Sequence, residues 1–200
     1  MSKKTQSGQT EIIVTGFGGQ GIILAGRILG MAASLGDKKE STLVQAYGPE
    51  SRGGACNAQV IIADHPIHYP YVDKPNILVA MSQAGYDKFA PALAADSILL
   101  VDQDLVNPEN AACGHYAISA TRMAENLGNK MMANIIMLGF CTAITQAVSS
   151  EAAQATIAQS VPKGSEDRNV EAFIKGFDYG LSTLKGREKR AAGRTGAVLQ

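Results

Sequence analysis

Cysteine is scarce in this sequence: Cys56, Cys113 and Cys141 are far apart, and no Cys-x-x-Cys pair occurs. Iron–sulfur clusters and structural zinc need several thiolates or imidazoles at close spacing. We therefore expect this chain to hold neither by itself, so any electron-transfer centre belongs on another chain. Dispersed cysteines without a signal peptide also predict a reduced, cytoplasmic protein.

An excess of charge of either sign is also missing, since 18 basic and 18 acidic residues give a formal net charge of zero. Proteins that bind nucleic acid or anionic membranes through long-range attraction usually carry a marked basic excess. Neither nucleic acid nor a membrane surface is therefore expected as the main partner. The balance favours a small molecule or another protein.

A membrane span is not expected either, although residues 131–150 contain no charged side chain over about the length that crosses a bilayer. Polar residues, among them Asn134, Thr142 and Gln146, interrupt this stretch. The apolar residues between them suit a helix that is buried inside a protein. The stretch therefore predicts a central core helix.

Apolar residues make up 46% of the 200 residues, which is enough for one well-packed domain. Short β-branched runs alternate with segments of helical spacing, which predicts an α/β fold. We expect a single domain with a mostly parallel sheet and helices on both faces, a Rossmann-like three-layer arrangement, followed by a helical C-terminal part. Strands are predicted over residues 11–15, 41–45, 57–63, 76–81, 97–102 and 115–118, and helices over residues 21–36, 86–93, 120–127, 131–148, 151–159 and 170–184.

The domain is expected to occupy residues 1–184, because apolar periodicity stops there. Residues 185–200 are basic and rich in small residues. Such a composition predicts a solvated, flexible tail, with docking on a partner as a possible use.

A glycine turn joins the first predicted strand to the first predicted helix. Its glycines permit a tight turn and expose N–H groups beside a helix N-terminus, where phosphate or carboxylate can bind. The alternative is a turn that only lets the helix pack closely on the strand. The turn also has the spacing of a dinucleotide-binding motif, but the acid required at the end of the second strand is absent, because Gln45 and Ala46 stand there. The candidate ligand or subunit-interface residues of this turn are Gly16, Gly18, Gly19, Gln20 and Gly21.

A second glycine-rich segment follows the second predicted strand. Because both segments follow the carboxyl ends of strands, we expect them at the same edge of the sheet, where ligands bind in open parallel sheets. Glu50 and Arg52 could pair with each other, Arg52 could hold an anion, or both could reach a partner chain. The candidates of this segment are Tyr47, Glu50, Ser51, Arg52, Gly53 and Gly54.

A metal site and a reactive thiol are two weaker hypotheses, and each has a structural alternative. His65 and His68 beside Asp64 could bind a metal if a third ligand came near, but the prolines around them favour a connection between two strands. Cys56 could be reactive if an arginine lowered its pKa, but a small buried side chain is the favoured reading.

The two glycine motifs together carry a resemblance to a known family. Gly-Phe-Gly-Gly-Gln-Gly-Ile followed by Tyr-Gly-Pro-Glu-Ser-Arg-Gly-Gly resembles the gamma subunits of 2-oxoacid:ferredoxin oxidoreductases, which act on 2-oxoglutarate, pyruvate or ketoisovalerate. The resemblance covers residues 10–184 and includes residues 75–81, 129–139 and 169–176. It implies a complex that converts a 2-oxoacid, coenzyme A and oxidised ferredoxin into acyl-CoA, CO2 and reduced ferredoxin. Among the substrates, 2-oxoglutarate is favoured.

The resemblance also implies how the work is divided in the complex. Thiamine diphosphate with magnesium would lie between the alpha and beta subunits, and the iron–sulfur clusters on the beta subunit or a small ferredoxin-like delta subunit. This chain would hold no cofactor and no catalytic residue, would be inactive alone, and would help to admit coenzyme A, with Arg52 near its phosphates. A stand-alone dinucleotide-binding oxidoreductase and a purely structural scaffold subunit remain as alternatives.

Overall fold

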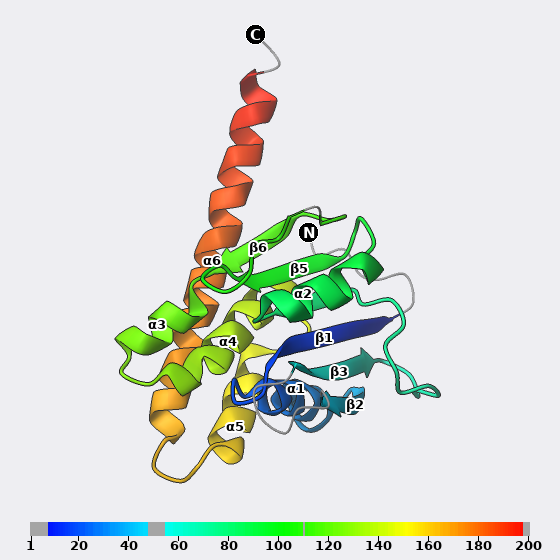
Figure 1. Cartoon of the computed structure of the whole chain (residues 1–200), viewed down its shortest axis with the longest axis vertical. Coiled ribbons are helices and arrows are strands. Elements are labelled where there is room, and N and C mark those ends of the chain that lie inside the picture. The colour runs from blue at the N-terminus through cyan, green and yellow to red at the C-terminus, as the bar shows by residue number, and fades with distance from the viewer. Residues whose placement is uncertain (1–7, 48–54, 110, 198–200) are drawn as a thin grey trace.

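The computed structural model describes residues 8–47, 55–109 and 111–197, with side chains described up to residue 190. The strands of these residues form one six-stranded sheet (Figure 1). Each predicted strand is present, the last with the predicted bounds and the others with bounds that differ by one or a few residues. The strand order across the sheet is β2-β3-β1-β4-β5-β6. The strands are β1 (Gln9–Phe17), β2 (Glu40–Tyr47), β3 (Ala55–Ala63), β4 (Ile77–Ala80), β5 (Ile98–Asp102) and β6 (His115–Ile118).

The sheet is mostly parallel, as predicted. Strands β1, β4, β5 and β6 pair in parallel, whereas β3 is antiparallel to both of its neighbours, β1 and β2. β2 therefore points in the same direction as β1, and β3 alone runs the opposite way. The strands β2 and β3 follow each other closely in the chain and pair as a hairpin.

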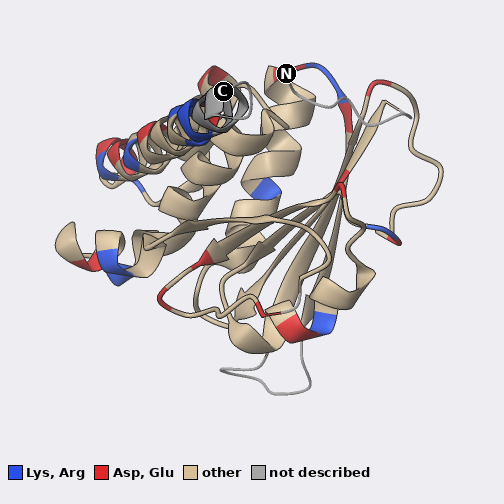
Figure 2. Ribbon diagram, turned by 90° about the horizontal axis from the view of Figure 1, so that it is seen from above, with Lys and Arg blue, Asp and Glu red and all other residues tan. Residues whose placement is uncertain are grey.

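Helices cover both faces of the sheet, which confirms the predicted three layers (Figures 1 and 2). Side chains alternate between the faces of a strand, so Ile12 and Val14 of β1 join the core under one layer, and Ile13 joins the core under the other. One layer contains α1 (Ile22–Met31) with its π-helical continuation η1 (Ala32–Gly36), α3 (Ala120–Asn126), η3 (Lys130–Met132), α4 (Ala133–Thr145), α5 (Ser150–Ser160) and α6 (Glu166–Ala197); the other contains α2 (Gln83–Phe89) and η2 (Ala90–Ala92).

Helix α4 is the core helix predicted from the uncharged stretch. Residues 133–143 are buried, and Phe140 is completely shielded from solvent. Two glycines let α4 and α6 approach backbone to backbone: a Cβ atom built on Gly139 would lie 2.0 Å from the Phe173 carbonyl oxygen. Of the helices in the described ranges, none combines the length and the apolar character that crossing a membrane requires.

Helix α6 extends beyond the predicted helix end at residue 184. It continues to Ala197, so the basic segment is helical over residues 185–197. Residues 185–190 are solvent-exposed, as expected for this composition. Arg187 still contacts β6, and beyond it the helix projects past that strand (Figure 1). The helix therefore continues although residues 185–190 bury no apolar face.

Candidate functional site

The glycine turn connects the end of β1 to the start of α1. Gly19 has φ of 97° and Gly21 has φ of 72°, both in the left-handed region that only glycine adopts freely. Gly21 is the N-cap residue of α1, and its carbonyl accepts the first helical hydrogen bond, from the Ala25 N–H at 3.0 Å. The first turn of α1 contains no acidic side chain. The turn thus brings a helix N-terminus with its partial positive charge to the edge of the sheet.

Gln20 braces this turn with both ends of its side-chain amide. Its Oε1 accepts a hydrogen bond from the Phe17 N–H at 2.6 Å, and its Nε2 donates to the Met81 carbonyl at 3.0 Å, just after β4. A Cβ atom on Gly16 would lie 2.4 Å from Gln20 Oε1, so a glycine is needed where the amide folds back. Gln20 is therefore a structural support of the turn, and its amide is already occupied within the chain.

Asn134 supports the turn from the side of α4. Its side chain is 2% exposed, its Nδ2 donates to the Gly21 carbonyl at 3.0 Å, and its Oδ1 accepts from the Ile135 N–H at 2.9 Å. A Cβ atom on Gly21 would lie only 2.3 Å from this Nδ2. Sequence reasoning noted Asn134 as a polar interruption of an apolar stretch and as part of a segment of family resemblance, and gave it no role at the turn. An amide within an otherwise apolar helix was the signal for this role.

Polar side chains also join the ends of the next strands, and sequence reasoning did not identify them. Gln83, at the start of α2, accepts from the Asn107 N–H at 2.8 Å, which links the segments after β4 and β5. Asp102 ends β5 with a fully buried carboxylate that accepts from the Thr121 N–H at 2.9 Å and from the Thr121 hydroxyl at 2.7 Å. Their signal was a polar residue at the end of a buried apolar strand or a few residues after it.

The glycine turn lies where the connections of the sheet change side. From β1 the chain passes to α1 on one face, and from the neighbouring parallel strand β4 it passes to α2 on the other face. In open α/β sheets, ligands bind outside the carboxyl ends of the strands at this kind of position. The turn therefore occupies the usual ligand-binding edge of its fold.

The second glycine segment begins at the same edge, as expected. Phe17 at the end of β1 pairs with Ala55, and Tyr47 at the end of β2 pairs with Cys56, so both strand ends flank the start of β3. Phe17 is 40% exposed and Tyr47 is 70% exposed, so each strand ends in an exposed aromatic side chain at this edge. The other candidates of this segment, Glu50, Ser51, Arg52, Gly53 and Gly54, lie outside the described residues.

The arrangement differs from a dinucleotide site in a second respect besides the missing acid. In such a site the second strand lies beside the first, which brings its acidic residue to the ribose. Here β3 lies between β1 and β2, so the end of β2 is displaced by about 10 Å, two strand spacings, from β1. Within the described residues, the end of β2 therefore brings no acidic side chain beside the glycine turn.

The three cysteines are buried and unpaired. Burial raises the pKa of Cys56 and of Cys113, and it raises the pKa of Cys141 to about 12, against a smaller lowering by Thr145. Cys56 is 5% exposed within β3, in agreement with its reading as a small buried side chain. The thiols therefore stay protonated at neutral pH and are poor nucleophiles and poor ligands.

Metal-binding side chains do not gather in the described ranges: nowhere in residues 8–47, 55–109 and 111–197 do three His, Cys, Asp or Glu side chains come together. His65 and His68 lie in the connection between β3 and β4, where the prolines placed them. The described ranges therefore assemble no cluster of ligands of the kind that an iron–sulfur cluster needs.

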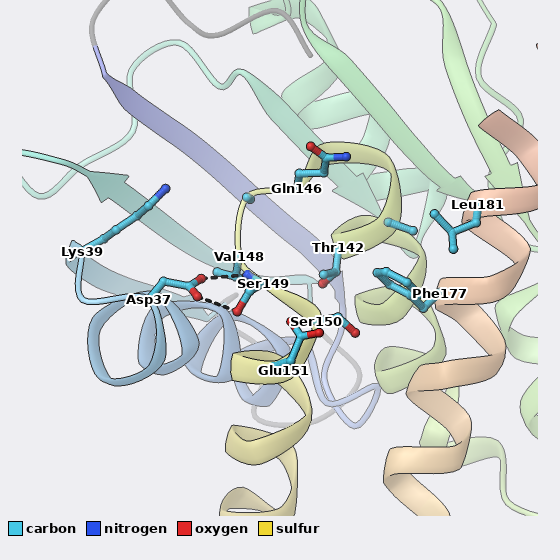
Figure 3. A pocket seen from close by; sticks show the side chains of 12 residues that line it. Asp37, Lys39, Thr142, Gln146, Val148, Ser149, Ser150, Glu151, Phe177 and Leu181 are labelled. Atoms are coloured by element: carbon cyan, nitrogen blue, oxygen red, sulfur yellow. Dashed lines mark hydrogen bonds between the residues drawn. The ribbon is translucent and has the colours of Figure 1, made fainter. Parts of the chain in front are cut away.

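A separate surface hollow of about 510 Å³ lies beyond the far end of α1 (Figure 3). Two of its polar residues bond to each other, since the Asp37 carboxylate accepts from the Ser149 N–H at 2.8 Å and from its hydroxyl at 2.5 Å. Phe177 and Leu181 of α6 form an apolar wall. The bonds between Asp37 and Ser149 hold the start of α5 against the segment after η1. The hollow itself is not continuous with the glycine turn, which lies at the opposite end of α1.

The fold and the glycine edge define a known class of protein. Residues 11–179 match the family described as pyruvate ferredoxin/flavodoxin oxidoreductase, and the chain belongs to this family. It is 47% identical over 182 residues to the 2-oxoglutarate synthase subunit KorC of Methanocaldococcus jannaschii, a match that covers 89% of this chain and 97% of KorC. The KorC subunit of Methanothermobacter marburgensis is 44% identical over 174 residues, covering 83% of this chain and 94% of that subunit.

Solved structures agree with this assignment. The gamma subunit of a keto/oxoacid ferredoxin oxidoreductase from Geobacter sulfurreducens matches with a TM-score of 0.77 and 38% identity over 86% of this chain and 99% of that subunit. A 2-oxoglutarate:ferredoxin oxidoreductase from Magnetococcus marinus shares the fold with a TM-score of 0.80 at 19% identity, over 88% of this chain and 32% of that longer chain. The resemblance to gamma subunits read from the glycine motifs is therefore confirmed.

Proposed function

We propose that this chain is the gamma-type subunit of a 2-oxoglutarate:ferredoxin oxidoreductase. The complex would convert 2-oxoglutarate and coenzyme A into acyl-CoA and CO2, and the two electrons released would reduce ferredoxin. The observation that carries the proposal is the 47% identity across 97% of the length of a 2-oxoglutarate synthase subunit. Matches to pyruvate synthase subunits are weaker, such as the 34% identity to PorC of Methanothermobacter marburgensis, which favours 2-oxoglutarate.

The cofactors of the proposed complex belong to its other subunits. Thiamine diphosphate and magnesium are assigned to the alpha and beta subunits, and the iron–sulfur clusters to the beta subunit or a small ferredoxin-like delta subunit. The three buried cysteines of this chain, with pKa values raised by burial, support this division of the work. The chain would accordingly be inactive on its own.

The glycine edge would face the other subunits and help to admit coenzyme A. Gln20 and Asn134 hold the turn from within, so the exposed backbone of Gly18 and Gly19 is presented outward in a fixed shape. Backbone N–H groups and an arginine are suited to the phosphates of coenzyme A. This role is proposed for residues 16–21 and 47–54, with Arg52 as the phosphate-binding side chain.

The overall proposal is tested with the reconstituted complex. This chain is co-expressed with its neighbouring subunits, and ferredoxin reduction is followed with 2-oxoglutarate, pyruvate and 2-oxoisovalerate. We expect kcat/KM for 2-oxoglutarate to exceed the other two by at least about tenfold, the range that contacts to one polar substrate group provide. If the isolated chain turns over a substrate, or purifies with a bound nicotinamide or flavin, the proposal is wrong and a stand-alone oxidoreductase is the better description.

The role of the edge has its own test in an Arg52→Ala complex. Loss of a charge-assisted phosphate contact is expected to raise the KM for coenzyme A about tenfold or more, with kcat changed less. Arg27→Ala, at an exposed position on α1, is the matched control and should leave this KM unchanged. An unchanged KM for coenzyme A in a fully assembled Arg52→Ala complex removes the proposed role, and a defect confined to assembly favours a scaffold subunit.

A further inference from the structure

Helix α6 is much longer than its packing requires. It has 32 residues, about 48 Å of helix, and its buried residues end at Gly180. The last side chain with a described contact to the body is Arg187, which donates to the His115 carbonyl and holds its guanidinium 3.7 Å from the centroid of the Tyr116 ring. Beyond this point the helix projects past β6, the last strand of the sheet (Figure 1).

The projecting part is strongly basic in a chain of zero net charge. Residues 185–190 include four exposed basic side chains and a single acid, Glu188. Five of the 18 basic residues of the chain stand in residues 185–200, so the remaining part carries a net negative charge. Figure 2 shows Lys and Arg segments on this end of α6. The charge of the molecule is therefore separated between its body and its projecting helix.

The sequence of this segment is poorly suited to a helix that stands alone in water. Lys185 and Lys189 are four residues apart and Arg187 and Arg190 three apart, so like charges are neighbours along the helix surface and repel. Gly186, Gly193 and Gly196 each lower the helix propensity by about 1 kcal/mol relative to alanine. The helix dipole favours cations in the last turn only, and Lys185 and Arg187 stand well before it. A negatively charged surface alongside would offset the repulsion between these side chains.

We propose that the projecting end of α6 docks on an acidic surface of another subunit of the complex, an inference that rests on the proposed function. Charge complementarity selects this partner, because the exposed side chains of residues 185–190 offer mainly cations and no apolar stripe. A second copy of this chain is the alternative occupant, and the oligomeric state of the isolated chain tests it. Arg187 positions the helix by its contacts to β6, and Lys185, Lys189 and Arg190 are the side chains that meet the partner.

The test reverses these three charges in the full complex. The variant Lys185→Glu, Lys189→Glu, Arg190→Glu leaves Arg187 in place, and its charge change is matched by Lys74→Glu, Lys163→Glu, Arg168→Glu at exposed positions elsewhere. Association with the other subunits is measured by co-elution and by titration at about 50 mM and about 300 mM KCl, where screening differs strongly. We expect the α6 variant to bind about tenfold or more weakly at low salt and to lose most of the salt dependence, because steering by complementary charges is removed. The control variant and the wild type should behave alike.

A chain ending at Leu184 gives an independent measurement, since it removes the segment without introducing acids. It should also bind the other subunits more weakly than the wild type, while the body stays folded and its melting temperature falls by only about 2–4 °C. Equal association of the wild type and the α6 variant, or an equal defect in both charge variants, overturns the proposal. A salt-dependent dimer of the isolated wild type would also overturn the proposal. The same holds if the wild type retains nucleic acid that the α6 variant loses, while both associate equally with the other subunits. Failure of the wild type to assemble with any subunit would instead contradict the proposed function itself.

Discussion

At the scale of single residues, the glycine turn is a small network of amides around a left-handed backbone. Gly21 combines a positive φ with the contact of Asn134 Nδ2 against the place of its missing Cβ. The two constraints are different in kind, since one is torsional and the other is a steric clash with a buried, hydrogen-bonded side chain. Their effects on stability can be separated by comparing Gly21 with a glycine that has a positive φ but open space at its Cβ position.

Gly21→Ala is expected to destabilise the chain more than Gly128→Ala. Both positions have positive φ, but a Cβ on Gly128 would meet nothing within 4 Å, whereas on Gly21 it lies 2.3 Å from Asn134. We expect a loss of about 1–2 kcal/mol for Gly128→Ala from the backbone alone, and about 3–5 kcal/mol for Gly21→Ala. Urea unfolding of the two variants measures the difference. Equal losses of unfolding free energy in the two variants would show that the Asn134 side chain does not clash with a Cβ atom at position 21.

Cys141 predicts a specific dependence of stability on alkaline pH. Its thiol is buried in α4, and its pKa is raised from 9.0 to about 12. Because the folded-state pKa lies above the unfolded one, the neutral thiol stabilises the fold fully below about pH 9, and this contribution is lost as the pH rises toward 12, by up to about 1.4 kcal/mol per pH unit. Cys141→Ala should be less stable at neutral pH by about 1–2 kcal/mol because of the lost packing.

The measurement is the free energy of unfolding of both proteins between about pH 7 and 11. Contributions from Cys56, Cys113 and the other titrating groups are common to both and cancel in the difference. The gap between the wild type and Cys141→Ala should be constant below about pH 8 and narrow above pH 9. Two parallel curves would contradict the prediction.

At the scale of elements, two kinds of contact hold the architecture around the glycine edge. Side-chain amides and carboxylates fasten consecutive strand ends: Gln20 links the turn after β1 to the end of β4, Gln83 links the segments after β4 and β5, and Asp102 links β5 to the start of α3. In the layer that contains α1, helices α4 and α6 pack with their backbones in close contact at Gly139 and Gly176. The first contacts fix the edge, and the second fix the direction in which α6 leaves the body.

Gly176→Ala tests the approach of the two helices. A Cβ at this position would lie 1.9 Å from the Ile136 carbonyl oxygen of α4, so the helices must separate, at an expected cost of about 3 kcal/mol or more. Gly186→Ala, on the same helix with nothing within 4 Å, is the matched control and should gain about 0.5–1 kcal/mol from helix propensity. Thermal and urea unfolding measure both. A neutral Gly176→Ala would show that the close approach is not required.

At the scale of the whole molecule, the body and the end of α6 differ in what holds them. The body is a three-layer domain with a hydrophobic core on each face of the sheet, whereas residues beyond Leu184 are joined to it chiefly through Arg187. We therefore expect a chain that ends at Leu184 to fold, with a melting temperature lower by about 2–4 °C, the effect of about 1 kcal/mol in a domain of this size.

The single substitution Arg187→Ala should account for most of that change, since it removes the hydrogen bond to His115 and the contact with the Tyr116 ring. Calorimetry of the isolated chains checks both expectations. A fall of more than about 10 °C in the truncated chain would mean that residues 185–197 belong to the folding unit.

Much of this architecture was predictable from local patterns, and the exceptions have physical reasons. Apolar runs such as residues 97–102 and the helical spacing of residues 131–148 predicted β5 and α4, because a buried strand or helix must be apolar wherever it lies. The insertion of β3 between β1 and β2 was not predictable, since pairing is a choice between distant segments. The helical state of residues 185–197 was missed because the prediction relied on an apolar stripe that this segment lacks.

The candidate site shows the same division. Positions 16–21 were identified because glycines between a strand and a helix are a local signal, and the edge shared with Tyr47 followed from strand direction. The bracing by Gln20 and Asn134 was not visible, because each amide contacts a backbone group far away in the sequence.

The sequence by itself determined the class of fold, the glycine turn and the lack of clustered thiolates in this chain, because these depend on residue type and short-range spacing. Tertiary structure alone decided that β3 separates the first two strands, that Asn134 lies under Gly21, and that α6 projects beyond the sheet. These features arise from packing between segments distant in the sequence, and the free energy of such contacts depends on shape and distance in the folded chain rather than on any local pattern.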